Sequence, residues 1–151
     1  MFLNSFTIFV ILIMNRTYQS IRSSECTLAK LSIRNDSILE IRFKHDDYEV
    51  DIKDQLEIMQ AVEELTDGGK KPFLILVVPG LYGGITPQAR NMEMFDTDAY
   101  RNHRAMAIVV HALHQRLLGT LYMTLKKRKP NYPYKLFPNE AEATKWLLSL
   151  A

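Results

Sequence analysis

The chain is poor in cysteine and nearly balanced in charge. Cys26 is the single cysteine among 151 residues, so no disulfide can form within the chain. This predicts a reducing compartment, and we expect a cytoplasmic protein. The 19 Lys and Arg against 17 Asp and Glu leave a formal net charge of +2. So small an excess does not indicate nucleic-acid binding, and the composition is typical of one globular domain.

The sequence also lacks an apolar run long enough to cross a bilayer, which takes about 20 residues. Residues 6–14 form a shorter apolar run that only Thr7 interrupts. A secretory signal would place cations before such a run, whereas Arg16 follows it. We therefore expect residues 1–26 to be an N-terminal extension whose residues 1–13 come from a start assigned upstream of Met14. A weak signal or anchor and an additional packed strand or helix are the alternatives.

The hydrophobic spacing changes along the rest of the chain. Period-two alternation on both sides of Asn35-Asp36 predicts a β-hairpin, and the later 3.6-residue spacing predicts helices between buried strands. The expected strands are residues 28–34, 38–43, 48–50, 73–78, 105–110 and 134–137. The expected helices are residues 52–65, 87–95, 113–125 and a terminal helix after Asn139.

Local signals mark the ends of these helices. Asp51 is placed to cap the first helix and Gly68-Gly69 to end it. Its apolar stripe, which we expect to face inward, consists of Ile52, Leu56, Met59, Val62 and Leu65. The residues expected to face inward on the terminal helix are Ala143, Trp146, Leu147 and Leu150.

The order of elements predicts an α/β fold with one domain at residues 27–151. Consecutive β-α-β crossovers are right-handed and lie on one sheet. We therefore expect a mixed sheet of about five to six strands and four helices, mainly on one face. At its centre, residues 73–90 predict a buried strand, a glycine loop and a helix start, and ligands in α/β folds bind where strands end in this way.

This succession resembles the bacterial STAS-like domains of the SpoIIAA-like group, which are related in fold to anti-sigma-factor antagonists and more distantly to CRAL-TRIO lipid-transfer domains. The resemblance covers residues 27–150. Its carriers are Lys70-Lys71-Pro72, Ile85-Thr86-Pro87-Gln88-Ala89-Arg90, Ala105-Met-Ala-Ile108, Arg116-Leu-Leu-Gly119, Tyr134-Lys-Leu-Phe137 and Glu140-Ala-Glu-Ala-Thr-Lys-Trp146-Leu147. In antagonist-type domains a phosphorylatable serine or threonine begins the helix after the central strand, beneath a docking kinase. Thr86 matches that position, although the usual Asp-Ser-Ser/Thr-Gly loop is absent and Pro87 follows directly.

The candidate partner-binding or anion-binding loop follows the central strand. Thr86 is either a plain helix cap or a phosphosite, and the glycines either form a flexible loop or bring backbone amides to an anion. If the loop binds an anion, Arg90 supplies the counter-charge. If the loop is only flexible, Arg90 forms a surface ion pair. The candidate residues are Pro79, Gly80, Tyr82, Gly83, Gly84, Thr86 and Arg90.

Other chemistry-bearing residues give weaker signals. The basic patch Lys126, Lys127, Arg128 and Lys129 is either a solvated helix end or a surface that attracts anionic lipid or nucleic acid. His111 and His114 have ligand spacing but no third ligand nearby.

These signals favour a non-enzymatic domain that binds a protein partner. The alternative is a carrier for a small lipophilic ligand or an anion. We expect no catalytic residue, metal or cofactor, and the sequence leaves a homodimer open.

Overall fold

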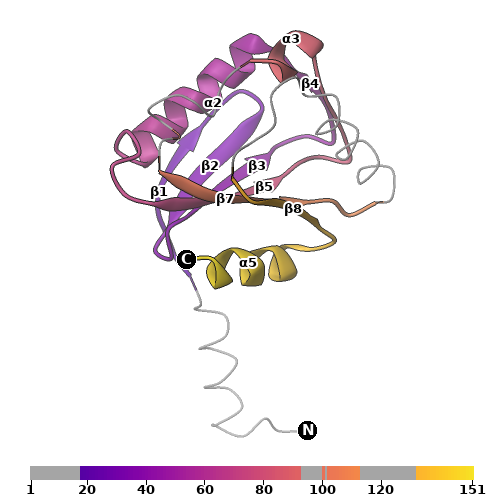
Figure 1. The fold of residues 1–151 in the computed structure, drawn as a ribbon. Helices are drawn as coiled ribbons and strands as arrows, with labels where there is room; N and C mark the ends of the chain where they lie inside the picture. The colour runs from indigo at the N-terminus through magenta and orange to yellow at the C-terminus, as the bar shows by residue number, and fades with distance from the viewer. Residues whose placement is uncertain (1–17, 93–99, 101, 113–131) are drawn as a thin grey trace, which may run out of the picture.

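The computed structural model describes residues 18–92, 100, 102–112 and 132–151. These residues form an α/β fold in which a twisted sheet separates two helical layers (Figure 1). The strands are β1 (Ser20–Glu25), β2 (Ala29–Arg34), β3 (Ile38–Phe43), β4 (Asp47–Val50), β5 (Phe73–Val78), β6 (Tyr82–Ile85), β7 (His103–Val109) and β8 (Tyr134–Phe137). The helices are α2 (Ile52–Leu65), α3 (Pro87–Arg90) and α5 (Glu140–Ser149).

The main sheet has six strands in the order β1-β2-β3-β5-β7-β8. Strands β1, β2 and β3 are antiparallel neighbours. The alternating pattern predicts the β2–β3 hairpin, whereas β1 is a strand that the sequence analysis did not predict. From β3 onward the pairs are parallel, with Ile38 opposite Leu74 and Ile75 opposite Met106. The sheet is therefore mixed, which confirms the predicted α/β class.

Strand β4 belongs to a separate two-stranded sheet. It pairs in parallel with β6, so that Asp47 lies opposite Tyr82 and Val50 opposite Ile85. The residues that we expected to be a glycine loop therefore include a strand. This pairing brings together the segments that follow β3 and β5.

Helix α2 covers one face of the main sheet and α5 the other (Figure 1). On the α2 face, Val62 packs with Leu39 and Ile75 in one buried cluster. On the α5 face, Leu147 packs with Ile38 and Leu74 in a second cluster. Because neighbouring strand residues point to opposite faces, β3 and β5 contribute to both cores, which explains the continuous apolar sequence of β5.

The ends of α2 follow the predicted signals. The Asp51 side chain accepts the Asp54 N–H at 2.9 Å, and the Asp54 side chain accepts the Asp51 N–H at 3.0 Å, which completes a capping box. After the helix, Gly68 and Gly69 adopt φ angles of 68° and 73°, a region in which glycine meets no Cβ penalty.

The first turns of α2 correct the predicted stripe. Ile52 and Leu56 are 43% and 53% exposed instead of facing inward. Gln55 and Ile58 are buried in this half of the helix. In these turns the buried face of the helix is therefore rotated away from Ile52 and Leu56, because the underlying sheet determines which side of the helix is covered.

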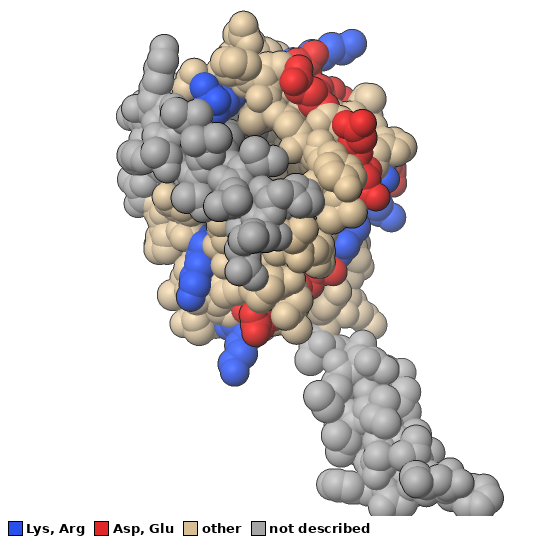
Figure 2. All heavy atoms as spheres, turned by 90° about the vertical axis from the view of Figure 1, so that its right-hand side faces the viewer, with Lys and Arg blue, Asp and Glu red and all other residues tan. Residues whose placement is uncertain are grey.

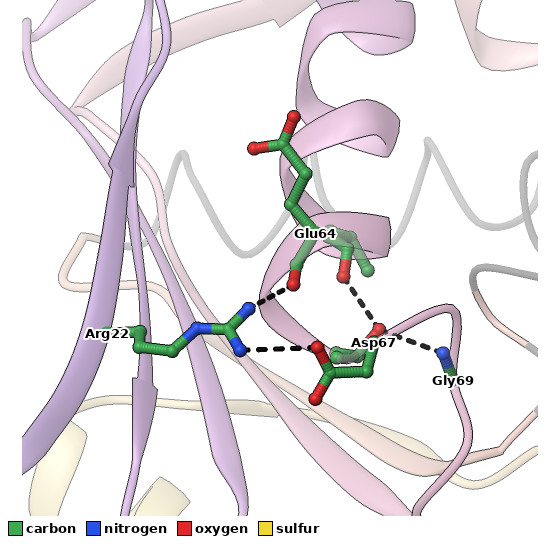
Figure 3. A network of polar contacts seen from close by, with 6 residues as sticks. Arg22, Glu64, Asp67 and Gly69 are labelled. Atoms are coloured by element: carbon green, nitrogen blue, oxygen red, sulfur yellow. Dashed lines mark hydrogen bonds and ion pairs between the residues drawn. The ribbon is translucent and has the colours of Figure 1, made fainter.

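A polar network joins the end of α2 to β1 (Figure 3). The Arg22 guanidinium donates to the Glu64 carbonyl and forms an ion pair with Asp67 at 3.2 Å. The Thr66 hydroxyl donates to the carbonyl four residues earlier and accepts the Gly69 N–H. Strand β1 lies within the segment that we predicted to be an N-terminal extension, and this network fixes it to the domain.

A buried arginine fixes the residues that precede β1. The Arg34 side chain is 2% exposed and forms an ion pair with Asp36 at 2.6 Å. The Tyr18 ring covers its guanidinium, with 3.4 Å between the guanidinium carbon and the ring centroid. The Asn35 side chain also accepts the Gln19 N–H at 3.0 Å. The chain is thus attached to the β2–β3 turn before β1 begins.

Some predicted elements differ or fall outside the described residues. Helix α3 ends at Arg90, where we predicted a helix to about residue 95. At the end of the chain, Leu150 is 42% exposed although we predicted it to face inward. The predicted helix 113–125, one of four expected, and residues 1–13 lie outside the described residues. The described helices also cover both faces instead of lying mainly on one.

Candidate functional site

The predicted site lies where the segment after β5 meets β4. Tyr48 stacks on Phe43, with ring centroids 4.6 Å apart and an interplanar angle of 4°. Its phenolic oxygen accepts the backbone N–H of Gly80 at 3.1 Å. Burial raises the pKa of Tyr48 to about 12, so the phenol is neutral at pH 7. One aromatic side chain therefore supports the start of the predicted loop from below.

Glycine is needed at two positions of this segment because other chain atoms come close. A Cβ built on Gly80 would lie 2.1 Å from the His45 carbonyl oxygen, and one built on Gly83 would lie 2.3 Å from the Tyr48 oxygen. At Gly84 the nearest atom, the Tyr48 carbonyl oxygen, is 3.7 Å away, an ordinary contact. Close packing explains the first two glycines.

Asp46 holds the turn between β5 and β6. Its carboxylate accepts the Leu81 N–H at 3.3 Å, and its carbonyl accepts the Tyr82 N–H at 2.6 Å. At the end of β6 the Thr86 N–H donates to the Val50 carbonyl at 3.0 Å. These amides point at protein acceptors, so the geometry favours a packed turn over an anion cradle.

Tyr82 projects from this supported backbone. Its side chain is 63% exposed, and its ladder partner on β4 is Asp47. Asp46, Asp47 and Glu49 are also exposed. Figure 2 shows acidic side chains gathered along the upper right of the face that it turns to the viewer. The surface thus combines an exposed aromatic ring with nearby negative charge.

Thr86 begins α3 as predicted. Its hydroxyl oxygen accepts the Ala89 N–H at 3.2 Å, and Pro87 occupies the first turn. The side chain is half-buried, and Pro79 and Arg90 are half-buried as well. The cap role that the sequence allows for Thr86 is therefore observed, while its modification stays a prediction.

The other candidates are only partly within the described residues. The basic patch Lys126, Lys127, Arg128 and Lys129 and the metal candidate His114 lie outside them, and His111 is exposed. The described residues hold no group of three His, Cys, Asp or Glu side chains arranged for a metal ion. Among the described helices, none has the length and apolar character of a membrane span.

Sequence reasoning missed the residues that shape the site from below. Asp46 and Tyr48 precede the glycine segment by more than 30 residues, and the signal that could have found them is the polar turn before a short strand. It also missed an aromatic group in which His103 lies 4.0 Å from the Tyr132 ring and 5.9 Å from Tyr100. Burial lowers the pKa of His103.

The fold and site define an α/β protein with a mixed six-stranded sheet and a two-stranded parallel sheet next to the candidate site. Residues 31–151 match the model of the family described as "Domain of unknown function (DUF7793)", and the chain belongs to this family. No curated protein and no solved structure matches the chain.

Proposed function

We propose that the chain is a non-enzymatic, STAS-like module of the cytoplasm that binds a protein partner through β6 and the turn before it. The succession of elements supports this proposal. An antiparallel hairpin leads into parallel strands separated by helices, and Thr86 begins the helix after the central strands. This is the place that the regulatory threonine or serine occupies in the antagonist-type domains that the sequence resembles.

The observation that carries the proposal is the exposed Tyr82 on a fixed backbone. Its own N–H is bonded to Asp46, and the turn before it is bonded to Tyr48. A side chain whose backbone is already ordered loses less conformational entropy on binding. Tyrosine is also among the residues that contribute most to protein interfaces.

Phosphorylation of Thr86 would regulate this surface. The added phosphate carries roughly −1.5 to −2 charges at pH 7. Thr86 follows β6 directly and bonds to the end of β4, next to the exposed Glu49. The modification would therefore add like charge to an acidic surface and weaken binding of a partner that complements it.

The experiment places a photo-activated cross-linking phenylalanine analogue at position 82 of the full chain in its own host. We expect one predominant cross-linked protein, identified by mass spectrometry. The same analogue at Tyr134, which is 37% exposed on β8, is the matched control. Equal products from both positions would contradict the proposed surface.

A second measurement tests binding with the purified partner. Tyr82→Ala should weaken binding about tenfold or more, as expected for an interface anchor. Thr86→Glu should weaken it while Thr86→Ser, which keeps the capping oxygen, should not. Unchanged affinity for Tyr82→Ala, with a folded variant confirmed by circular dichroism, would show that the partner binds elsewhere.

A further inference from the structure

The outer face of α2 carries apolar side chains that the domain does not cover. Ile52 and Leu56 are 43% and 53% exposed. They are four residues apart, so they lie on the same side of the helix, one turn from each other. Gln60, one further turn along, is exposed as well. Exposed apolar residues at this spacing form a surface suited to contact with another helix.

Charges of opposite sign lie at the two ends of this face. Lys53 is on the first turn of α2 and Glu64 on the last, and both are exposed. In the described part of the chain neither side chain belongs to an ion pair. Figure 3 shows the Glu64 carboxylate pointing away from Arg22, whose guanidinium bonds instead to the Glu64 carbonyl and to Asp67.

We infer that this face binds a second copy of the chain, with the two α2 helices antiparallel. In that arrangement the first turn of each helix meets the last turn of the other. Lys53 of each copy then lies opposite Glu64 of the other, and each Leu56 lies against the segment around Gln60 of the other copy. The contact is self-complementary, as a two-fold symmetric dimer requires.

A parallel arrangement of the two helices would be unfavourable because of the same charges. It would place Lys53 beside Lys53 and Glu64 beside Glu64, and like charges in contact are unfavourable. The charge distribution therefore favours the antiparallel arrangement of the two helices.

One helix face is small compared with a standard interface of about 1,600 Å², so the dimer is weak and concentration-dependent. This surface does not include Tyr82, so dimerisation does not depend on the proposed function.

Sedimentation velocity of the full chain, over a dilution series up to about 1 mM, tests the inference. We expect reversible dimerisation that Leu56→Ser weakens about tenfold, as for a central interface residue. Leu148→Ser, which changes a leucine that is 43% exposed on α5, is the control and should leave the dimer unchanged.

Charge reversal identifies the orientation. Lys53→Glu and Glu64→Lys should each weaken the dimer, because each places like charges opposite one another. The double variant Lys53→Glu/Glu64→Lys should restore it. A chain that stays monomeric throughout the series, or a dimer that none of these changes affects, would overturn the inference.

Discussion

The backbone N–H of Gly80 donates a hydrogen bond to the phenolic oxygen of Tyr48, which lies 32 residues earlier in the chain. This bond joins the turn after β5 to β4. Together with the β4–β6 ladder, it converts a glycine-rich segment into a supported surface from which Tyr82 projects.

Tyr48→Phe tests the contribution of this hydrogen bond to stability. Phenylalanine keeps the ring that stacks on Phe43 but removes the acceptor of the Gly80 N–H. We expect the free energy of unfolding to fall by about 1–2 kcal/mol, measured by urea denaturation, because this partly buried hydrogen bond is lost. Tyr134→Phe, at an exposed position on β8, is the control. Equal stability of the two variants would contradict this role.

The pKa of Tyr48 predicts a loss of stability at high pH. Burial raises it from 10 to about 12, so between these values the unfolded state releases the phenolic proton while the folded state keeps it. Stability is therefore complete below pH 10 and falls as the pH rises toward 12. Burial also raises the pKa of Tyr100, which acts in the same direction.

Unfolding monitored at a series of alkaline pH values, with tyrosinate absorbance as a second signal, measures this loss. In Tyr48→Phe the decline should be smaller than in the unmodified chain, because the shifted phenol of Tyr48 is gone. Identical alkaline profiles for the two proteins would contradict the buried, neutral state of Tyr48.

Gly83→Ala and Gly84→Ala form a matched pair of substitutions on β6. The new Cβ at Gly83 would lie 2.3 Å from the Tyr48 oxygen, whereas at Gly84 it would lie 3.7 Å from the nearest atom. We expect the first variant to lose about 1–3 kcal/mol, because an overpacked site must shift. The second should stay close to the unmodified chain. Thermal unfolding compares them, and equal losses would disprove the close packing at Gly83.

Arg34→Lys tests the buried guanidinium before the β2–β3 turn. Lysine cannot reproduce the two bonds from Arg34 to the Asp36 carboxylate or stack its charge flat against the Tyr18 ring. We expect a loss of about 1–2 kcal/mol in urea denaturation, the scale of a charge-assisted hydrogen bond. Arg22→Lys should lose less, because the Arg22 side chain is 46% exposed and exposed ion pairs contribute little.

The features predicted correctly from the sequence depend on residues that are close together in the chain. The Asn139 side chain accepts the Glu142 N–H at 2.9 Å, and Gly68 ends α2 with a positive φ. Both follow from short-range rules for helix ends. The hairpin also shows its alternation directly in the sequence, and the buried strand β5 shows its continuous apolar run.

The features that the sequence analysis missed depend on contacts between distant residues. Gly83 and Gly84 have low strand propensity, and they form β6 because β4 lies alongside. Leu56 fits an inward-facing stripe by spacing alone, yet it is exposed because the position of α2 on the sheet decides which side is buried. For the same reason Tyr82 could be placed in the candidate site from the sequence, but Tyr48 beneath it could not.

The core on the α5 face also determines when the protein can finish folding during its synthesis. Ile38 and Leu74 are covered by Ala143 and Leu147, which the ribosome adds far later in translation. Until α5 has left the exit tunnel, Ile38 and Leu74 lack the cover that Ala143 and Leu147 provide, and apolar surface exposed in this way during folding is prone to aggregation. A chain truncated before residue 143 would therefore leave these apolar side chains without that cover.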